Sequence, residues 1–500
     1  MQRILLALLI LLAPGSVMAQ SINNNTTQLP DSGSIATTVI SRQAGLTYVT
    51  DFCSAAETNG TSSSTACVQR AVNALCARSF GSGILYFPVG EYLIDGTVTI
   101  GCSGITLQGA GFGDRDPVTS SPLKWNAGTY IHVQGTGSAP AFLAKVTSFT
   151  NKWGETNAPS NTGFSYGFTV KDMQFYQYPY NRTGPFVEMD SWQQAMIDHV
   201  YMFGPCVGVK IAGGFYVSVN NSIIEGDSPG CDVVQITGSV ANHFSTTDVV
   251  NFEKVKINTN SGACYAITDR VQTVWWKNTT CETSGSALKS SCPTMTSPLY
   301  CPGFFTLYDF EAEGFAGNGS NLINLIDIKD LVDGMKMTDS WLRGSSKLDA
   351  QGNRLIVNTL MAVTPQRFPL GNLNLNISNN WLKFAGGACL YLESPNVHVI
   401  GNQIYGCNFF NIGASGVEVR ANRAVVSGNN FCGGDFLNDV DWQMIPGYVL
   451  AGKDYVTFTG NVYSGDVGTL GVGKHNGCSG PVYAPSPGAH TSFTVGNVGP

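Results

Sequence analysis

Hydrophobic and polar residues alternate in short segments along most of this 500-residue chain, and the segments recur. In each one, apolar residues occupy every second position and a turn containing asparagine follows. Clear copies lie at 215–224, 373–382, 397–406, 424–433 and 455–464. An alternation of period two turns one face of a strand toward a core. The pattern therefore predicts many short strands that are joined by turns, with no helix between them.

The spacing of these segments predicts a solenoid. Turn asparagines recur at steps of 23, 27 and 32 residues. They are Asn379, Asn402, Asn429 and Asn461. A second strand type recurs directly behind a cysteine, as at 206–211, 231–236 and 389–394. Repeats of this size with two or three short strands are typical of a parallel β-helix. We expect one right-handed parallel β-helix of about a dozen coils, with the turn asparagines hydrogen-bonded along the stack.

One helix is predicted near the start of the chain, over residues 64–78. Its apolar residues recur at i, i+3, i+4 and i+7, which is the pattern of an amphipathic helix. They are Val68, Ala71, Val72 and Leu75. Ser64 or Thr65 would cap its first turn. Because the first coil of a solenoid exposes its core and strand edges, we expect this helix to serve as an N-terminal cap.

The segment that follows carries a family resemblance. Residues 81–113 read GSGILYFPVGEYLIDGTVTIGCSGITLQGAGFG. With the preceding helix, this segment resembles the first coils of the pectate-lyase superfamily, and more closely its rhamnogalacturonase/epimerase-like right-handed β-helix branch. The motif match covers 51–113, and the repeats extend the likeness over most of 81–478. The resemblance implies the fold and not one reaction, because the superfamily includes hydrolases, lyases, epimerases, depolymerases and members without known chemistry.

The catalytic motifs of the best-known members are absent. Polygalacturonase-type enzymes carry Asn-Thr-Asp, Asp-Asp, Gly-His-Gly and Arg-Ile-Lys, none of which occurs here. The Trp-Ile-Asp-His signature of a pectate-lyase branch is matched only in part, by MIDH at 196–199. Neither of these two pectin-degrading subfamilies is therefore indicated.

The ends of the chain and its cysteines predict the compartment. Residues 1–19 hold one arginine, a short apolar run and small residues before a cleavage site, as in a secretory signal peptide. The run is too short to span a membrane. Fourteen cysteines, an even number, fit an oxidising compartment. We expect a secreted protein, whose segments are a polar lead-in (20–50), the cap helix and first coils (51–113), the β-helix (114–478) and a Pro/Gly-rich tail (479–500).

Three disulfides are predicted from the positions of the cysteines. The pairs are Cys206–Cys231, Cys389–Cys407 and Cys292–Cys301. In the first two pairs, both cysteines occupy the same register one coil apart, and adjacent coils lie about 4.8 Å apart, close to the span of a disulfide. The third pair would clamp a local loop. The alternative is a ladder of buried, unpaired cysteines. No cysteine or histidine pair has zinc-binding spacing, so no metal framework is expected.

Charge is scarce. Lys and Arg number 27 and Asp and Glu number 34, which is 12% of the chain with a net charge of −7. This balance argues against a nucleic-acid-binding protein, which would carry a basic patch. Neutral residues suit a solenoid, because like charges on adjacent strands repel. Any cluster of acidic residues therefore stands out.

One such cluster lies in LYDFEAEGF, residues 307–315. Alternation predicts that Asp309, Glu311 and Glu313 share the outer face of a strand. The inward face would then be formed by Tyr308, Phe310 and Ala312. Paired carboxylates hydrolyse glycosidic bonds at separations of about 5 Å or about 6.5–9.5 Å, and mutual repulsion raises the pKa of at least one of them. A solvated acidic face or a Ca²⁺ site is the alternative. Glu282 is a further catalytic candidate.

Aromatic and basic residues supply the candidates for substrate binding. Aromatic rings stack on sugar faces, and basic groups would serve as the base of a lyase, with Ca²⁺ as its cation. The candidates are Tyr178, Tyr180, Trp192, Trp275, Lys277 and Arg343.

We therefore expect a secreted polysaccharide-degrading enzyme, a glycoside hydrolase with paired carboxylates in a groove on the β-helix and no cofactor. The alternatives are a polysaccharide lyase, in which Arg343 or Lys277 would be the base, and a non-catalytic carbohydrate-binding or surface-structural solenoid. Its partner would be a polysaccharide, and no nucleic acid and no membrane span are expected. The sequence makes no prediction of oligomeric state.

Overall fold

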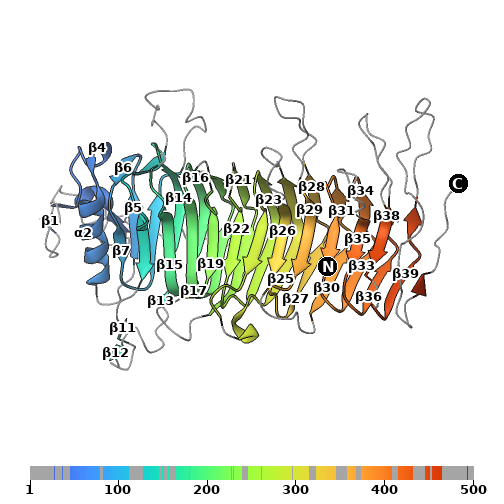
Figure 1. Ribbon diagram of the computed structural model, residues 1–500. Helices are drawn as coiled ribbons and strands as arrows, with labels where there is room; N and C mark the ends of the chain where they lie inside the picture. Colours follow the sequence, from blue (N-terminus) through green and yellow to red (C-terminus); the bar gives the residue numbers. More distant parts are fainter. Residues whose placement is uncertain are drawn as a thin grey trace, which may run out of the picture.

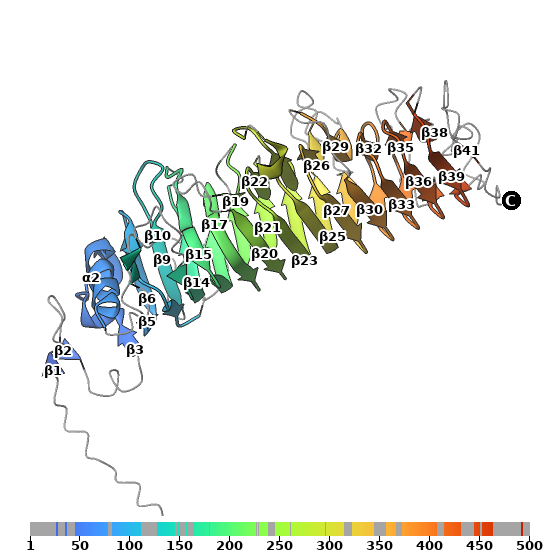
Figure 2. The same ribbon diagram turned by 90° about the horizontal axis from the view of Figure 1, so that it is seen from below.

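The computed structural model is an elongated stack of parallel strands that runs in sequence order from one end to the other (Figures 1 and 2). The residues that it describes are 27–28, 36–37, 46–78, 83–111, 128–145, 149–150, 156–157, 165–179, 181–226, 228, 230–238, 246–260, 262–295, 297–314, 323–344, 357–366, 373–407, 415–431, 445–450, 453–463 and 492–493. The expected signal peptide lies outside these residues, as do most of the expected lead-in and tail.

The strands form three parallel sheets, A, B and C, and four long strands bend so that they belong to both A and B. Sheet A contains β4 (Asn59–Ser63), β6 (Gly90–Ile94), β9 (Thr129–Val133), the second parts of β14 (Thr169–Tyr176), β16 (Met196–Phe203), β23 (Thr273–Thr283) and β25 (Phe304–Gly314), and β18 (Ile223–Gly226), β21 (Lys256–Thr259), β28 (Trp341–Gly344), β31 (Trp381–Lys383), β34 (Gln403–Tyr405), β37 (Asn430–Phe431) and β40 (Val462–Tyr463).

Sheet B takes the first parts of the four bent strands. It also contains β3 (Leu46–Tyr48), β5 (Gly83–Phe87), β8 (Ile105–Gly109), the second part of β17 (Val207–Asn220), β20 (Thr247–Glu253), β27 (Gly334–Thr338), β30 (Asn374–Ser378), β33 (Val397–Ile400), β36 (Ala424–Ser427), β39 (Val456–Thr459) and β41 (Ser492–Phe493).

Sheet C completes each coil. It contains β7 (Val98–Ile100), β10 (Phe142–Lys145), β15 (Pro185–Gln193), the first part of β17, β19 (Val234–Thr237), β22 (Tyr265–Thr268), β24 (Leu288–Ser291), β26 (Asn324–Lys329), β29 (Thr359–Thr364), β32 (Leu390–Leu392), β35 (Ser415–Val419) and β38 (Ile445–Val449). Short elements outside the sheets are β1 (Thr27–Gln28) with β2 (Ala36–Thr37), β11 (Phe149–Thr150) with β12 (Thr156–Asn157), β13 (Ser165–Tyr166) against the end of β15, and 3₁₀ turns at Val49–Asp51 and Pro298–Tyr300.

Within each coil, alternate residues point inward and stack on their counterparts in the next coil. In sheet A, Ile257, Cys281, Ala312, Leu342 and Leu382 occupy one such inward column, and all five are fully buried. Burial of apolar columns along the whole stack provides the driving force for this fold. The prediction of a parallel solenoid from period-two alternation is confirmed.

A left-handed residue marks the bend between sheets B and A in successive coils. These residues include Asn278, Asp309, Asp339 and Asn379, with φ between 50° and 58°. In the next three coils glycine takes the same place, at Gly401, Gly428 and Gly460. Asparagine, aspartate and glycine adopt this conformation most readily. The bend resets the alternation, so the residue after it points inward.

The expected asparagine ladder forms directly after these bends. The Nδ2 of Asn402 donates to the Oδ1 of Asn429 at 2.9 Å, and Asn429 donates in the same way to Asn461 at 3.0 Å. The first member is Asn380, which donates to Asn402 at 2.9 Å. Asn379 is instead the left-handed bend residue and is exposed. The ladder is confirmed, with its first position moved by one residue.

The single α-helix of the described residues, α2 (Thr65–Cys76), lies at the N-terminal end of the stack (Figure 1). Its four predicted apolar positions are fully buried. The side-chain amide of Gln69 makes two hydrogen bonds with the backbone of Thr99 on β7, at 2.7 and 2.9 Å. The expectation that the Ser64 or Thr65 side chain caps the helix is wrong, because the Ser64 hydroxyl bonds Glu57 and Leu93 and the Thr65 hydroxyl bonds Asp95. Two expectations stay predictions: that the helix serves as the N-terminal cap of the solenoid, and that the solenoid has about a dozen coils.

Six disulfides join the twelve cysteines that the structure describes. The three predicted pairs, Cys206–Cys231, Cys389–Cys407 and Cys292–Cys301, are confirmed. The three others are Cys53–Cys67, Cys76–Cys102 and Cys264–Cys281. The last of these joins sheet C to sheet A across the inside of a coil, so register along one sheet could not reveal it. No helix in the described part of the chain is long and apolar enough to cross a membrane.

Candidate functional site

Three carboxylates gather on the outer face of sheet A, near the middle of the stack. Glu282 lies on β23, and Glu311 and Glu313 lie on β25. Glu282 stands directly opposite Glu313 in the parallel pairing. Cys281, which precedes Glu282, and Ala312, which lies between Glu311 and Glu313, are fully buried, so the carboxylates point outward. Neighbouring strands lie about 4.8 Å apart, and we call these three residues the carboxylate cluster.

Two members of the cluster are paired with cations from the flanking coils. The Nζ of Lys256 on β21 lies 3.0 Å from the Oε1 of Glu282. On the other side, the Nη2 of Arg343 on β28 lies 2.7 Å from the Oε1 of Glu313. Both are charge-assisted contacts at hydrogen-bond distance. Glu311 makes no ion pair or side-chain hydrogen bond with the described residues, so it is the uncompensated member.

The electrostatics of the cluster single out Glu311. Partial burial raises the pKa of its carboxyl group, and the negative charges of Glu282 and then Glu313 raise it further. Lys256 and Arg343 offset part of this effect. Glu311 therefore keeps its proton to a higher pH than an ordinary glutamic acid, and it lies beside two carboxylates that are paired with cations. A proton donor next to a carboxylate in a different environment is what an acid and a base require.

Aromatic and basic side chains continue the same outer face toward the C-terminal end. Trp341 on β28 is paired in register with Trp381 on β31, whose side chain is 50% exposed. The Nζ of Lys383 lies 5.2, 5.6 and 5.4 Å from the ring centres of Trp341, Trp381 and Tyr405. Arg343 lies over the Trp341 ring at 5.2 Å. The cluster is thus followed by an aromatic surface that carries positive charge.

Of the predicted catalytic residues, the structure brings Glu282, Glu311 and Glu313 together and leaves out Asp309. Asp309 is the left-handed bend residue, with φ of 50°. The bend breaks the alternation, so Tyr308 and Asp309 are both exposed at the corner. The predicted shared face of Asp309 with the two glutamates is therefore wrong, as is the inward position of Tyr308. Phe310 and Ala312 are buried, as predicted.

The predicted binding residues are divided among several places. Arg343 belongs to the cluster, but Trp275 and Lys277 lie on the outer face of sheet B, before the bend at Asn278. Lys277 pairs with Glu253 at 3.0 Å and not with Glu282. Trp275 is exposed there.

The aromatic candidates near the start of the stack also differ from one another. Trp192 is fully buried beside Phe168, at 5.5 Å between ring centres, so its expected place on a sugar-binding surface is wrong. Ser191 has a φ of 63°, which resets the alternation along the strand, so Trp192 points inward. Tyr178 is 68% exposed. Tyr180 lies outside the described residues.

The sequence analysis missed Lys256, Trp341, Trp381 and Lys383. A signal for three of them exists, because Trp-Leu-Arg at 341–343 and Trp-Leu-Lys at 381–383 occupy the same place in two consecutive coils. Large exposed side chains repeated at an outward position of a solenoid do not serve the core. Such a repeat favours a binding surface.

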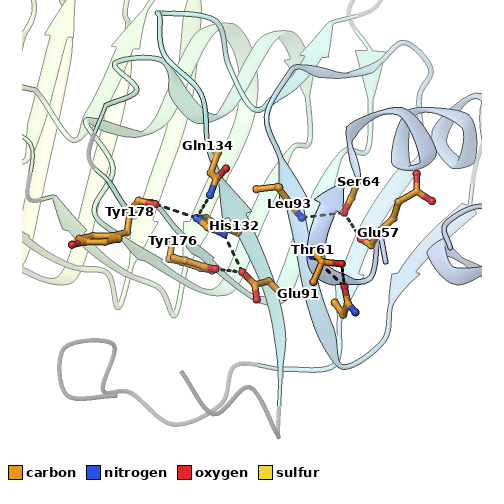
Figure 3. A network of polar contacts seen from close by, with 10 residues as sticks. Glu57, Thr61, Ser64, Glu91, Leu93, His132, Gln134, Tyr176 and Tyr178 are labelled. Carbon is orange, nitrogen blue, oxygen red and sulfur yellow. Dashed lines mark hydrogen bonds and ion pairs between the residues drawn. The ribbon is translucent and has the colours of Figure 1, made fainter. Parts of the chain in front are cut away.

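A second polar network lies on sheet A at the N-terminal end (Figure 3). The Glu91 carboxylate accepts a hydrogen bond from the Tyr176 hydroxyl and lies 3.0 Å from the Nδ1 of His132. His132 stacks on Tyr176, and its Nε2 lies 3.1 Å from Gln134 and 3.2 Å from the Tyr178 carbonyl oxygen. Burial, and the bond to Glu91, raise the pKa of Tyr176, so its phenol stays protonated and donates. These groups are mostly buried and bonded to one another, as in a structural network.

Among known proteins, the chain matches solved structures but no family model and no curated sequence. Among solved structures, tailspike protein 3 of bacteriophage CBA120 matches with a TM-score of 0.61 over 96% of this chain and 67% of that chain, at 10% identity. This likeness shows that the chain has a right-handed parallel β-helix fold. This confirms the resemblance that the first coils carry, at the level of the fold.

Two further structures are similar at a TM-score of 0.49. They are the A-module of the mannuronan C-5 epimerase AlgE4 from Azotobacter vinelandii (13% identity, 89% of this chain, 99% of that chain) and DFA-IIIase from Arthrobacter chlorophenolicus A6 without its lid (11% identity, 88% and 98%). At these identities the likeness does not extend to the reaction. No three or more His, Cys, Asp or Glu side chains of the described residues are arranged to hold a metal ion.

Proposed function

We propose that this protein is a secreted enzyme that hydrolyses glycosidic bonds of a polysaccharide at the carboxylate cluster. The observation that carries the proposal is the unequal state of the three carboxylates. The pKa of Glu311 is raised and its carboxyl group has no cationic partner among the described residues, while Glu282 and Glu313 are each paired with a cation. One proton donor beside an ionised partner is the arrangement that glycoside hydrolysis needs.

In this proposal Glu311 is the general acid and Glu282 is the general base. Glu311 donates its proton to the oxygen of the departing sugar, and Glu282 takes a proton from the water that attacks the anomeric carbon. The Glu282 side chain is 38% exposed, against 18% for Glu313, so water reaches it more readily. Glu313, paired with Arg343, adds to the effect of burial and of Glu282 in raising the pKa of Glu311, and its carboxylate would stabilise positive charge on the sugar.

The backbone spacing predicts the stereochemistry. Glu282 and Glu311 are diagonal neighbours on adjacent strands, a relation that places Cα atoms about 7–8 Å apart. Carboxylates about 6.5–9.5 Å apart leave room for water and invert the anomeric carbon, whereas a pair about 5 Å apart retains its configuration. We therefore expect inversion.

The structure gives less support to the lyase alternative. A lyase base must lose its proton before it abstracts one from the sugar. Arg343 is paired with Glu313 at 2.7 Å, and Lys277 is paired with Glu253 at 3.0 Å on sheet B. Both candidate bases are therefore already engaged by a carboxylate. Secretion is supported by the six disulfides, because such bonds persist in oxidising compartments.

The test is incubation of the protein with a panel of neutral and acidic polysaccharides. New reducing ends without the ultraviolet absorbance of an unsaturated sugar, and a product of inverted anomeric configuration by NMR, are expected. Glu311→Gln should lower the rate by about 10²–10⁴-fold, the usual effect of losing a general acid. Asp309→Asn is the matched control, because it removes a carboxylate from the same strand off the site, and it should retain the wild-type rate. Unsaturated products, a fully active Glu311→Gln variant, or silence on every polymer would overturn the proposal.

A further inference from the structure

Among the described residues, Lys383 on the outer face of sheet A beyond the carboxylate cluster is a cation without a counter-ion. We propose that Lys383 forms a subsite for an anionic group of the polysaccharide, a carboxylate or a sulfate ester on a sugar whose ring lies on Trp381. This inference rests on the proposed function, because it takes a polysaccharide as the ligand. It goes further in stating that the polysaccharide is anionic.

The first support is the charge balance of sheet A. Lys256 and Arg343 are each paired with a glutamate of the cluster. The Lys383 ammonium pairs with no carboxylate of the described residues, and strands β28, β31 and β34 contain no acidic residue. Ring faces attract a cation without neutralising it. The ammonium therefore keeps its donors and its charge for a ligand.

The second support is the shape of the surface around Lys383. Trp341 and Trp381 stand in register on adjacent coils, and half of the Trp381 side chain is exposed. The Lys383 ammonium lies within 5.6 Å of both ring centres and within 5.4 Å of the Tyr405 ring centre. Exposed indole rings offer a flat apolar surface on which a sugar ring can stack. An ammonium at the edge of that surface reaches a charged substituent of the stacked sugar.

The third support is the distance from the carboxylate cluster. Glu311, Trp341 and Trp381 follow one another across three adjacent strands of sheet A. Two strand spacings amount to about 10 Å. A polysaccharide that lies along the axis of the solenoid therefore reaches from the cluster, over Trp341, to Lys383. The anionic sugar would occupy a subsite next to the cleaved bond and not the bond itself.

The experiment measures binding without turnover, in the Glu311→Gln background. The probes are polygalacturonate, dextran sulfate and neutral dextran, titrated by calorimetry at low and at physiological ionic strength. We expect at least one anionic polymer to bind more tightly than dextran and to weaken as salt screens the charge. Polygalacturonate above dextran sulfate identifies a carboxylate as the ligand group, and the reverse order identifies a sulfate.

The added substitution Lys383→Gln should weaken binding of the preferred anionic polymer about tenfold, as for loss of one charge-assisted hydrogen bond. Lys383→Arg should keep most of the affinity. Lys336→Gln removes the same charge from an exposed lysine on sheet B and should change nothing. Equal affinity of the Lys383→Gln and parent proteins, absence of binding to both anionic polymers, or equal affinity for dextran would overturn the inference.

The two proposals fail separately. If hydrolysis depends on Glu311 but replacement of Lys383 does not change binding, the anionic subsite is refuted and the proposed hydrolase stands. Lys383-dependent binding of an anionic polymer that the wild-type protein does not cleave would remove the hydrolase and leave the subsite.

Discussion

Replacement of Asn402 by alanine tests what holds the C-terminal coils in register. Its side chain is fully buried at the bend between sheets B and A. The Oδ1 accepts hydrogen bonds from the backbone and side-chain nitrogens of Asn380, both at 2.9 Å. The Nδ2 donates to the Ile377 carbonyl oxygen at 2.8 Å and to the Oδ1 of Asn429 at 2.9 Å. One amide thus connects three successive coils.

The magnitude follows from the groups that lose a partner. In Asn402→Ala, the backbone N–H of Asn380 and one N–H of its side-chain amide lose their acceptor at a site that water does not reach, while the other side-chain N–H keeps its bond to the Met337 carbonyl oxygen. An unsatisfied buried polar group costs about 1–3 kcal/mol. Two such groups give a loss of about 2–6 kcal/mol, which is large for a single substitution. Gln403→Ala is the control, because Gln403 is the next residue in the sequence and its side chain is exposed. This substitution should change the free energy of unfolding by less than about 0.5 kcal/mol.

Hydrogen exchange and urea unfolding together suit this measurement. A solenoid is stabilised mainly through contacts of each coil with its neighbours, so the loss should appear first as weaker amide protection in β31, β34 and β37. The urea midpoint should fall in parallel. If Asn402→Ala and Gln403→Ala have the same midpoint and the same protection, the asparagine ladder does not stabilise the stack and the reasoning is refuted.

Two further predictions concern charge and covalent linkage. Because the native state raises the pKa of Glu311, ionising this group opposes folding, so its contribution to stability falls as pH rises above the ordinary glutamic acid value. Glu311→Gln should therefore unfold at a higher temperature than the wild type at neutral pH, with no difference below about pH 4, and an equal difference at both pH values would contradict this. Replacing Cys389 and Cys407 by serine opens a bridge with a sequence separation of 18, and the urea midpoint should show a loss of about 3 kcal/mol, whereas an unchanged midpoint would show that stacking alone holds these coils.

The solenoid could be predicted because its signals are repeated and local. Alternation of period two identified the strands, and the helical spacing of Val68, Ala71, Val72 and Leu75 identified α2. Two disulfides followed from cysteines that precede the same strand in successive coils. Each of these signals depends only on neighbours in the sequence or on a register that the repeat itself preserves.

The bends between sheets could not be located to the residue. At the bend between sheets B and A, the left-handed position is aspartate at Asp309, asparagine at Asn278 and Asn379, but lysine at Lys254. Residue type is therefore a weak guide to this conformation. If the bend is predicted one residue away from its true position, every side chain from there to the end of the strand is assigned to the wrong face. This is why Asp309 was wrongly placed beside Glu311.

The pairing of side chains across coils also could not be predicted from the sequence. Glu282, Glu313, Arg343 and Lys383 occupy one outward row, yet successive members are separated by 31, 30 and 40 residues. The numbers of residues between successive strands differ, and the sequence does not mark where each strand resumes. The ion pairs of Arg343 and Lys256 therefore became visible only with the register.

The low charge of the chain makes the outer face of sheet A informative. Inward positions are set by packing, and most outward positions are neutral, since repulsion between adjacent coils disfavours a row of like charges. Glu282 beside Glu313, with Glu311 on the diagonal, departs from that rule between two adjacent coils. Lys256 and Arg343 pair with two of the three carboxylates, and the pKa of the third, Glu311, is raised. A stack selected for stability alone would place a neutral residue at position 311, so the retained acid is the strongest reason to look for chemistry there.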